Sequence, residues 1–164
     1  MGRQRLREGA MLYRLPYEHP LDRLGHQLQQ ARSITPDLIA QVIAQACVRF
    51  TALGASAKAK VDRLIASSAW TDAAFALLAL ELPQWSIRRL IRDDSEWLCS
   101  LSHTPALPPD LDETIEATHQ ILPLAVLLAL LEARRVASAE VARSTTVPQV
   151  RPLTDHLMCT DNFS

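Results

Sequence analysis

The sequence predicts a mainly α-helical fold of the α+β class, and three observations predict it. Apolar residues recur with helical spacing over 36–53, 72–82 and 111–137. Between residues 85 and 101 the spacing changes to alternation around a turn-forming Asp-Asp-Ser, which is typical of a β-hairpin. The 164-residue chain is 48% hydrophobic and 21% charged, a globular composition. We therefore expect a compact helical domain of four or five helices with one β-hairpin at about 85–101.

The chain is long enough for one hydrophobic core, because a chain of this size buries about 70% of the surface that its unfolded form exposes. We expect a single helical domain over residues 34–140. Residues 1–33 are expected to form a polar, Arg-rich lead-in that is partly mobile, within which Leu21, Leu24 and Leu28 have the spacing of a short docking helix. Residues 141–164 are expected to form a loosely attached tail.

The helices are predicted from their end signals as well as their spacing. Thr35 is a good N-cap for the first long helix, and Gly54 follows its last periodic residue. Ser56 is the expected cap of a second, shorter helix. Thr71 is the expected cap of the third helix, and Pro83 ends it.

The hairpin prediction has one competitor. A helix over 86–92 is the alternative, because the apolar residues in that stretch also fit helical spacing. In the hairpin, Trp85 and Trp97 flank the turn, and we expect them to form a cross-strand pair.

The last long helix is predicted over 111–137, after a loop at 103–110 that contains three prolines. Acidic residues near its start and Arg134 and Arg135 near its end complement the helix dipole. Pro123 falls inside this stretch and is expected to bend or split the helix.

Composition excludes several classes of protein. Seventeen basic and eighteen acidic residues give a net charge of −1, so bulk nucleic-acid binding is not expected. The longest nearly apolar run, 121–131, is too short to span a membrane. The first thirty residues lack the apolar run of a secretory signal. With four glycines, the chain contains no P-loop, dinucleotide-binding or nucleophile-elbow motif.

The three cysteines predict a cytoplasmic location. Cys47, Cys99 and Cys159 are odd in number and widely spaced, which indicates reduced thiols and not a disulfide framework or zinc site. Cys99 lies four residues before His103, which is the spacing of a possible activated thiol, but the pattern around Cys99 favours a buried, inert thiol.

Aromatic and basic residues gather near the predicted hairpin, and they form our candidate binding surface. With no catalytic motif in view, the sequence favours a small non-enzymatic interaction or regulatory protein that uses the hairpin and the acidic loop after it to bind another protein. No cofactor is expected, and a homo-oligomer is left open. The candidate surface residues are Trp85, Arg88, Arg89, Arg92, Trp97 and His103.

Charge is unevenly distributed, and two interpretations stay open. Residues 93–119 carry seven carboxylates and no Lys or Arg, whereas residues 1–92 carry thirteen basic and seven acidic residues. In one interpretation the acidic loop pairs internally with Arg88, Arg89 and Arg92. In the other, the polarised surface steers a charged partner.

A metal-binding protein or metalloenzyme is the first alternative. Glu116 and His119 have an ExxH spacing, which on a helix would place a carboxylate and an imidazole on one face, with Asp112 one turn earlier. These three residues are weak metal-ligand candidates, because a second ExxH is missing and acids at a helix start also serve the dipole. The second alternative is nucleic-acid binding through the Arg-rich N-terminal residues.

Part of the chain resembles a family of small uncharacterised bacterial proteins. The resemblance is carried by ELPQWSIRRL at 81–90, DDSEWLCSLS at 93–102, EATH at 116–119 and LPL at 122–124, and it spans roughly residues 35–137. It implies a bacterial cytosolic origin and modestly favours the hairpin. The family has no assigned activity, so the resemblance transfers no site.

Overall fold

The computed structural model describes residues 20–108, 112 and 114–144, which form six helices and one three-stranded sheet. This arrangement confirms the mainly α, α+β prediction. The elements in chain order are α1 (Pro20–Gln30), α2 (Pro36–Ala46), α3 (Val48–Ala52), α4 (Ala55–Ala66), α5 (Trp70–Glu81), β1 (Ser86–Asp93), β2 (Glu96–Ser102), β3 (Thr114–His119) and α6 (Leu122–Ser144).

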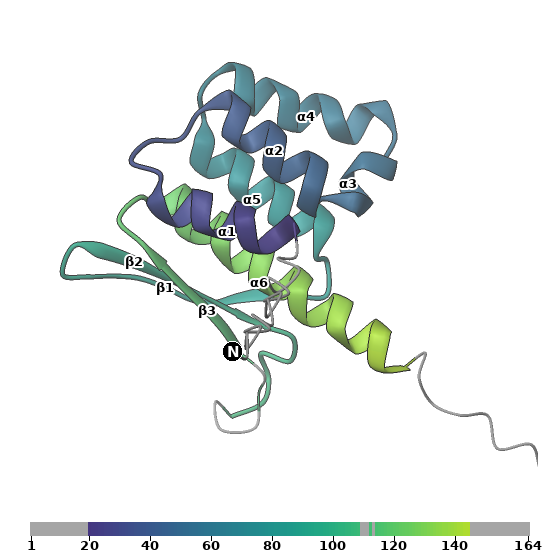
Figure 1. The fold of residues 1–164 in the computed structure, drawn as a ribbon, viewed down its shortest axis with the longest axis vertical. Helices are drawn as coiled ribbons and strands as arrows, with labels where there is room; N and C mark the ends of the chain where they lie inside the picture. The colour runs from purple at the N-terminus through teal and green to yellow at the C-terminus, as the bar shows by residue number, and fades with distance from the viewer. Residues whose placement is uncertain (1–19, 109–111, 113, 145–164) are drawn as a thin grey trace, which may run out of the picture.

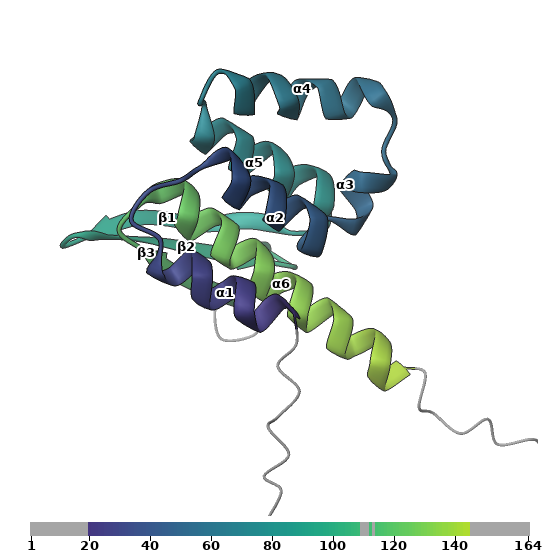
Figure 2. The same cartoon turned by 45° about the horizontal axis from the view of Figure 1, so that its top comes forward.

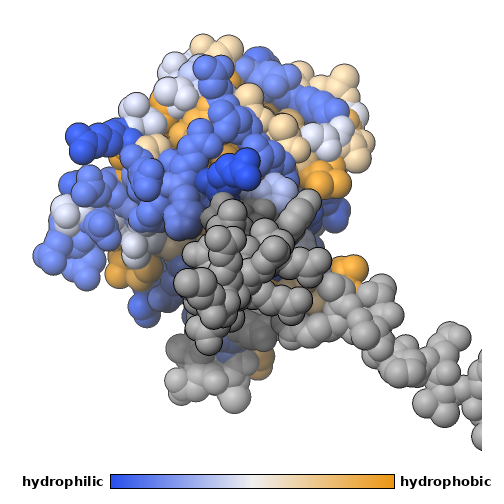
Figure 3. Space-filling view, viewed as in Figure 1, coloured by the Kyte–Doolittle hydropathy of each residue, from blue (hydrophilic) through white to orange (hydrophobic). Residues whose placement is uncertain are grey.

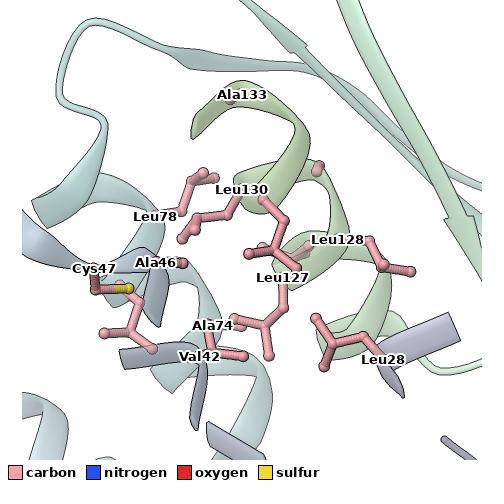
Figure 4. Packing of buried hydrophobic residues seen from close by; sticks show 14 of the residues in the cluster. Leu28, Val42, Ala46, Cys47, Ala74, Leu78, Leu127, Leu128, Leu130 and Ala133 are labelled. Carbon is pink, nitrogen blue, oxygen red and sulfur yellow. The ribbon is translucent and has the colours of Figure 1, made fainter. Parts of the chain in front are cut away.

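Helix α6 is the centre of the fold. One side of α6 packs against β2 and β3, and the other contacts α5, α1 and α2 (Figure 1). Residues 124–131 are all buried, as expected for a helix that is apolar on every face. Figure 4 shows Leu130 of α6 beside Leu78 of α5 within this core. Helix α4 packs against α5 and lies on the side away from the sheet (Figure 2).

The sheet is an antiparallel meander of order β1-β2-β3, and it confirms the predicted hairpin over the alternative helix at 86–92. The two-residue turn Asp94-Ser95 joins β1 to β2 and pairs Asp93 with Glu96. Asp94 has φ 48°, in the left-handed region that Asp tolerates better than most residues. A register shift between Ile87 and Arg89 marks a bulge at Arg88.

The prediction of one helix over 111–137 was wrong at its start. Residues 114–119 form β3, where Ile115 and Ala117 are half-buried and alternate with exposed Thr114, Glu116 and Thr118. Pairing with β2 along the whole strand selects this extended structure over a helix. Helix α6 begins only at Leu122.

Pro123 does not bend or split α6. It is the second residue of the helix, in the first turn, where the missing N–H of proline leaves no intrahelical hydrogen bond unmade. The helix then continues to Ser144, beyond the predicted domain end at residue 140.

The predicted helix over 36–53 is interrupted at Cys47, which separates α2 from α3. Thr35 caps α2 as predicted, since its hydroxyl accepts a hydrogen bond from Leu38 N at 3.2 Å. The interruption is stabilised by Glu81, whose buried Oε2 accepts a hydrogen bond from Phe50 N at 2.9 Å in the first turn of α3. The other carboxylate oxygen, Oε1, lies 3.4 Å from Arg134 Nε of α6.

The predictions for the start of α5 and for the buried face of α1 had different outcomes. Thr71 is not the cap of α5, because the helix starts at Trp70, two residues before the predicted start, and Ala69 occupies the N-cap position. Leu21, Leu24 and Leu28 do form the buried face of the short helix α1, and they join the same core as the rest of the domain. Residues 1–19 and 145–164, most of the predicted lead-in and tail, lie outside the described residues.

Candidate functional site

The six predicted surface residues lie at two different ends of the hairpin. Three belong to what we call the hairpin base, residues 85–88 and 101–104. The other three belong to what we call the distal hairpin, residues 89–98. Trp85, Arg88 and His103 are at the base, and Arg89, Arg92 and Trp97 are in the distal hairpin.

A hydrogen-bond network centred on Asp112 closes the base. The Arg88 guanidinium forms an ion pair with Asp112, and Ser102 Oγ donates to Asp112 Oδ2 at 2.5 Å. Thr104 donates to Asp112 Oδ1 through its backbone N–H at 3.3 Å and its hydroxyl at 3.1 Å. Arg88 also donates to the carbonyl of Leu107 at 3.2 Å. These bonds fasten Asp112 and the chain after β2 to the sheet.

The same network governs the charge state of Asp112. Its side chain is fully shielded from solvent, yet the hydrogen bond from Ser102, followed by those from Thr104 and Arg88, holds the pKa of the carboxyl below its ordinary value. Burial acts to raise the pKa, but the hydrogen bonds have the larger combined effect. For Arg88 the charge pattern therefore reflects internal pairing, because its guanidinium is bound to Asp112 and to the Leu107 carbonyl.

Trp85 and Trp97 do not form the predicted cross-strand pair. The turn at Asp94-Ser95 fixes a register in which Ser86 pairs with Ser102, so the ring next to Trp85 is that of His103, edge-on at 5.4 Å and 78°. Trp97 instead lies opposite Arg92. Trp85 is only 9% exposed, which makes it part of the core and not of a surface platform.

The side chains of the distal hairpin make no hydrogen bond or ion pair with another described residue. The guanidinium of Arg92 lies over the Trp97 ring, 5.9 Å from its centroid, a cation–π contact. Arg89 makes no hydrogen bond or ion pair within the described residues. Ile91 shares the Arg89 face of the strand and is 43% exposed. Figure 3 shows mostly hydrophilic surface over this projecting end.

The exposed isoleucines Ile87 and Ile91 were missed as surface residues by the sequence reasoning. Alternation alone places both on one side of a strand, but the bulge at Arg88 puts them on opposite faces, with Ile87 opposite Leu101 and Ile91 opposite Leu98. The available signal was the alternation with Arg88 and Arg92, because basic residues are enriched on edge strands.

The three metal-ligand candidates are not brought together. Glu116 and His119 lie on a strand, where residues three apart point to opposite faces: Glu116 is exposed and His119 is buried. Asp112 is held by the base network. Within the described residues there is no cluster of three His, Cys, Asp or Glu side chains that would hold a metal ion.

Cys99 is a buried thiol, as the sequence favoured. It lies in the middle of β2 against the core, and burial raises its pKa to about 11, so at neutral pH it carries its proton. The His103 ring packs against Trp85, so it does not serve as a base for the Cys99 thiol. Cys47 is also buried, and burial together with the nearby Glu81 carboxylate raises its pKa to about 12, against the opposing charge of Arg134.

The two edges of the sheet differ. Strand β3 packs against α6, and Gln29 Nε2 of α1 donates to the carbonyl of Thr118 at 3.4 Å. On its outer side β1 pairs with no other described strand. The more open edge of the sheet is therefore β1, which carries the distal hairpin.

No protein-family model, curated protein or solved structure matches this chain. The resemblance described for residues 35–137 therefore gains no support from these comparisons. No described helix has both the length and the apolar character needed to cross a membrane. The first part of the Arg-rich segment proposed for nucleic-acid binding, residues 1–19, is outside the described ranges.

Proposed function

We propose that this protein is a non-enzymatic protein-interaction protein whose distal hairpin docks an extended segment of a partner. The observation that carries the proposal is the contrast between the two edges of the sheet. The outer edge of β1 pairs with no other described strand and has exposed isoleucines beside it, whereas β3 contacts α6 and accepts a hydrogen bond from Gln29 of α1.

An open edge strand supports binding by strand addition. The outward N–H and C=O groups of β1 have no partner strand in the described part of the chain, and an extended peptide that pairs with them gains main-chain hydrogen bonds. Strand β1 has eight residues, long enough for several such bonds. Ile87 and Ile91, 39% and 43% exposed, offer apolar contacts beside that edge.

Charge indicates the composition of the partner segment. Arg89 and Arg92 are exposed on opposite faces of β1, and neither guanidinium has a carboxylate partner within the described chain. A segment that alternates apolar and acidic residues would place its carboxylates on the face of Arg89 and its apolar residues on the opposite face, which carries Ile87. The partner that we propose is therefore a protein with an acidic, strand-forming segment.

The buried, free thiols of Cys47 and Cys99 are compatible with a reducing compartment, so we place this interaction in the cytoplasm as part of the proposal.

The test is a binding titration of the full chain with two fluorescent peptides of the length of β1. One alternates Val and Glu, and the other alternates Val and Lys. We expect the acidic peptide to bind and its affinity to fall as salt is raised, because exposed charges are screened. Arg89→Glu should weaken binding by about tenfold, and Lys60→Glu, a matched charge reversal on the exposed side of α4, should leave it unchanged.

Equal binding of the two peptides, or equal losses in Arg89→Glu and Lys60→Glu, would contradict the proposed charge recognition. No binding of the acidic peptide to the wild-type chain would overturn the proposal that β1 accepts an acidic strand.

A further inference from the structure

A separate polar cavity lies where three segments meet: the end of α1, the start of β2 and the turn between β3 and α6. Its volume is about 470 Å³, within the range of small-molecule sites. Its polar wall includes the side chains of Gln29, Gln30, Arg32, Glu96, His119 and Gln120.

His119 is the most informative residue of this wall. It is only 5% exposed, and its Nδ1 accepts a hydrogen bond from Ile121 N at 2.9 Å. A ring nitrogen that accepts carries no proton, so the proton of the neutral imidazole is on Nε2. Within the described residues nothing accepts a hydrogen bond from that Nε2–H. His119 lines the cavity, so this Nε2–H is free to donate to a ligand there.

The cavity also holds one charge of each sign. Arg32 and Glu96 both line it, and neither forms an ion pair or hydrogen bond with another described residue. They come from different segments, the α1–α2 connection and the first residue of β2. A purely anionic ligand would leave Glu96 repelled, and a purely cationic ligand would leave Arg32 repelled.

The start of α6 adds to the positive side of the cavity. Gln120 and Ile121 line the wall just before the first turn of this 23-residue helix, whose N-terminal end carries partial positive charge. The N-terminal end of α6, Arg32 and the Nε2–H of His119 together favour the binding of a carboxylate group. Glu96 favours an ammonium group. The side-chain amides of Gln30 and Gln120 can both donate and accept hydrogen bonds.

We infer that this cavity binds a small zwitterion, a free α-amino acid with a polar, uncharged side chain. Its carboxylate contacts Arg32 and the Nε2–H of His119, and its ammonium group contacts Glu96. Of the cavity residues, only Glu96 belongs to the distal hairpin, and it lies on β2. The cavity does not use the outer edge of β1, to which the peptide is proposed to bind.

The experiment titrates the full ¹⁵N-labelled chain with three probes while the imidazole nitrogen signals are followed. The probes are L-glutamine, N-acetyl-L-glutamine, which lacks the ammonium group, and the α-amide of L-glutamine, which lacks the carboxylate. We expect L-glutamine to shift the His119 Nε2 signal, and each blocked probe to bind about tenfold more weakly or worse. His119→Gln assigns the signal.

Exposed variants keep the test independent of folding. Arg32→Gln and Glu96→Gln should each weaken L-glutamine binding several-fold, and Glu96→Gln should leave the binding of N-acetyl-L-glutamine unchanged or improve it. Arg23→Gln and Asp62→Asn, exposed residues outside the cavity, are the matched controls and should bind as the wild type does. An unchanged His119 signal with L-glutamine, or equal affinity for all three probes, would overturn the inference.

Discussion

The hairpin base and the distal hairpin have similar residues but opposite roles. Each contains one tryptophan and at least one arginine. At the base, Arg88 is ion-paired with Asp112 and Trp85 packs edge-on against His103. In the distal hairpin, Arg89 has no such partner among the described residues, and Ile91 is exposed.

Residue type therefore does not decide which arginine or tryptophan is available to a partner. The segment after β2 decides it, because Asp112 and Thr104 return to the sheet only at the base. Replacing a residue of the hairpin base should therefore lower the free energy of unfolding. Replacing a residue of the distal hairpin should change peptide binding with little effect on that free energy.

The largest effect is expected for Trp85→Ala. Truncating a buried aromatic side chain leaves a cavity, so we expect a loss of about 3 kcal/mol in the free energy of unfolding, measured by urea titration. The matched variant Trp97→Ala, at a half-buried position, should lose only about 1 kcal/mol. Equal losses would remove the distinction between base and distal hairpin.

The next effect concerns Asp112→Asn and depends on pH. The folded-state pKa of Asp112 is below its unfolded value of about 3.9, so its carboxylate stabilises the fold above that pH, and the contribution is lost as the pH falls through the folded-state pKa. Asp112→Asn should be less stable than the wild type at neutral pH, and thermal melts should show the difference shrinking in acid. A constant difference at every pH, or a loss matched by Asp62→Asn on α4, would show that the Asp112 charge does not stabilise the fold.

A smaller effect is expected between Arg92 and Trp97. A double-mutant cycle with Arg92→Gln and Trp97→Leu should give a coupling of about 0.5 kcal/mol in the free energy of unfolding, the range of an exposed cation–π contact. A coupling of several kcal/mol would mean that the distal hairpin is as tightly structured as the base.

The smallest effect on stability is expected for Arg89→Glu. Its side chain is exposed and makes no ion pair with the described residues, so the free energy of unfolding should change by about 0.5 kcal/mol or less. The same variant should lose most of its binding to the acidic peptide. Destabilisation comparable to that of Trp85→Ala would assign Arg89 to the fold and not to docking.

The sequence predicted elements whose signals are local. The cap at Thr35, the hairpin turn at 93–95 and the buried face of α1 all follow from residues within a few positions of one another. Strand β3 was not predictable in this way. Its alternation over 114–119 is short, and only pairing with β2 distinguishes it from a helix that continues into the apolar run at 121–131.

The candidate site was predicted in composition but not in arrangement. All six residues lie on or beside the hairpin, but the turn at Asp94-Ser95 pairs Trp97 with Arg92, and the ring that meets Trp85 is that of His103. The pairing of Arg88 with Asp112 joins residues 24 positions apart and depends on how the chain after β2 returns to the sheet. The cavity around His119 draws on three segments, and no spacing in the sequence brings them together.

The most direct test of the docking surface is amide hydrogen exchange of the full chain with and without the Val–Glu peptide. Strand addition predicts new protection of amides along β1 and no change along β3, because only the β1 edge gains hydrogen-bond partners. Protection that appears at β3 instead, or bound peptide with no new protection in β1, would contradict the account.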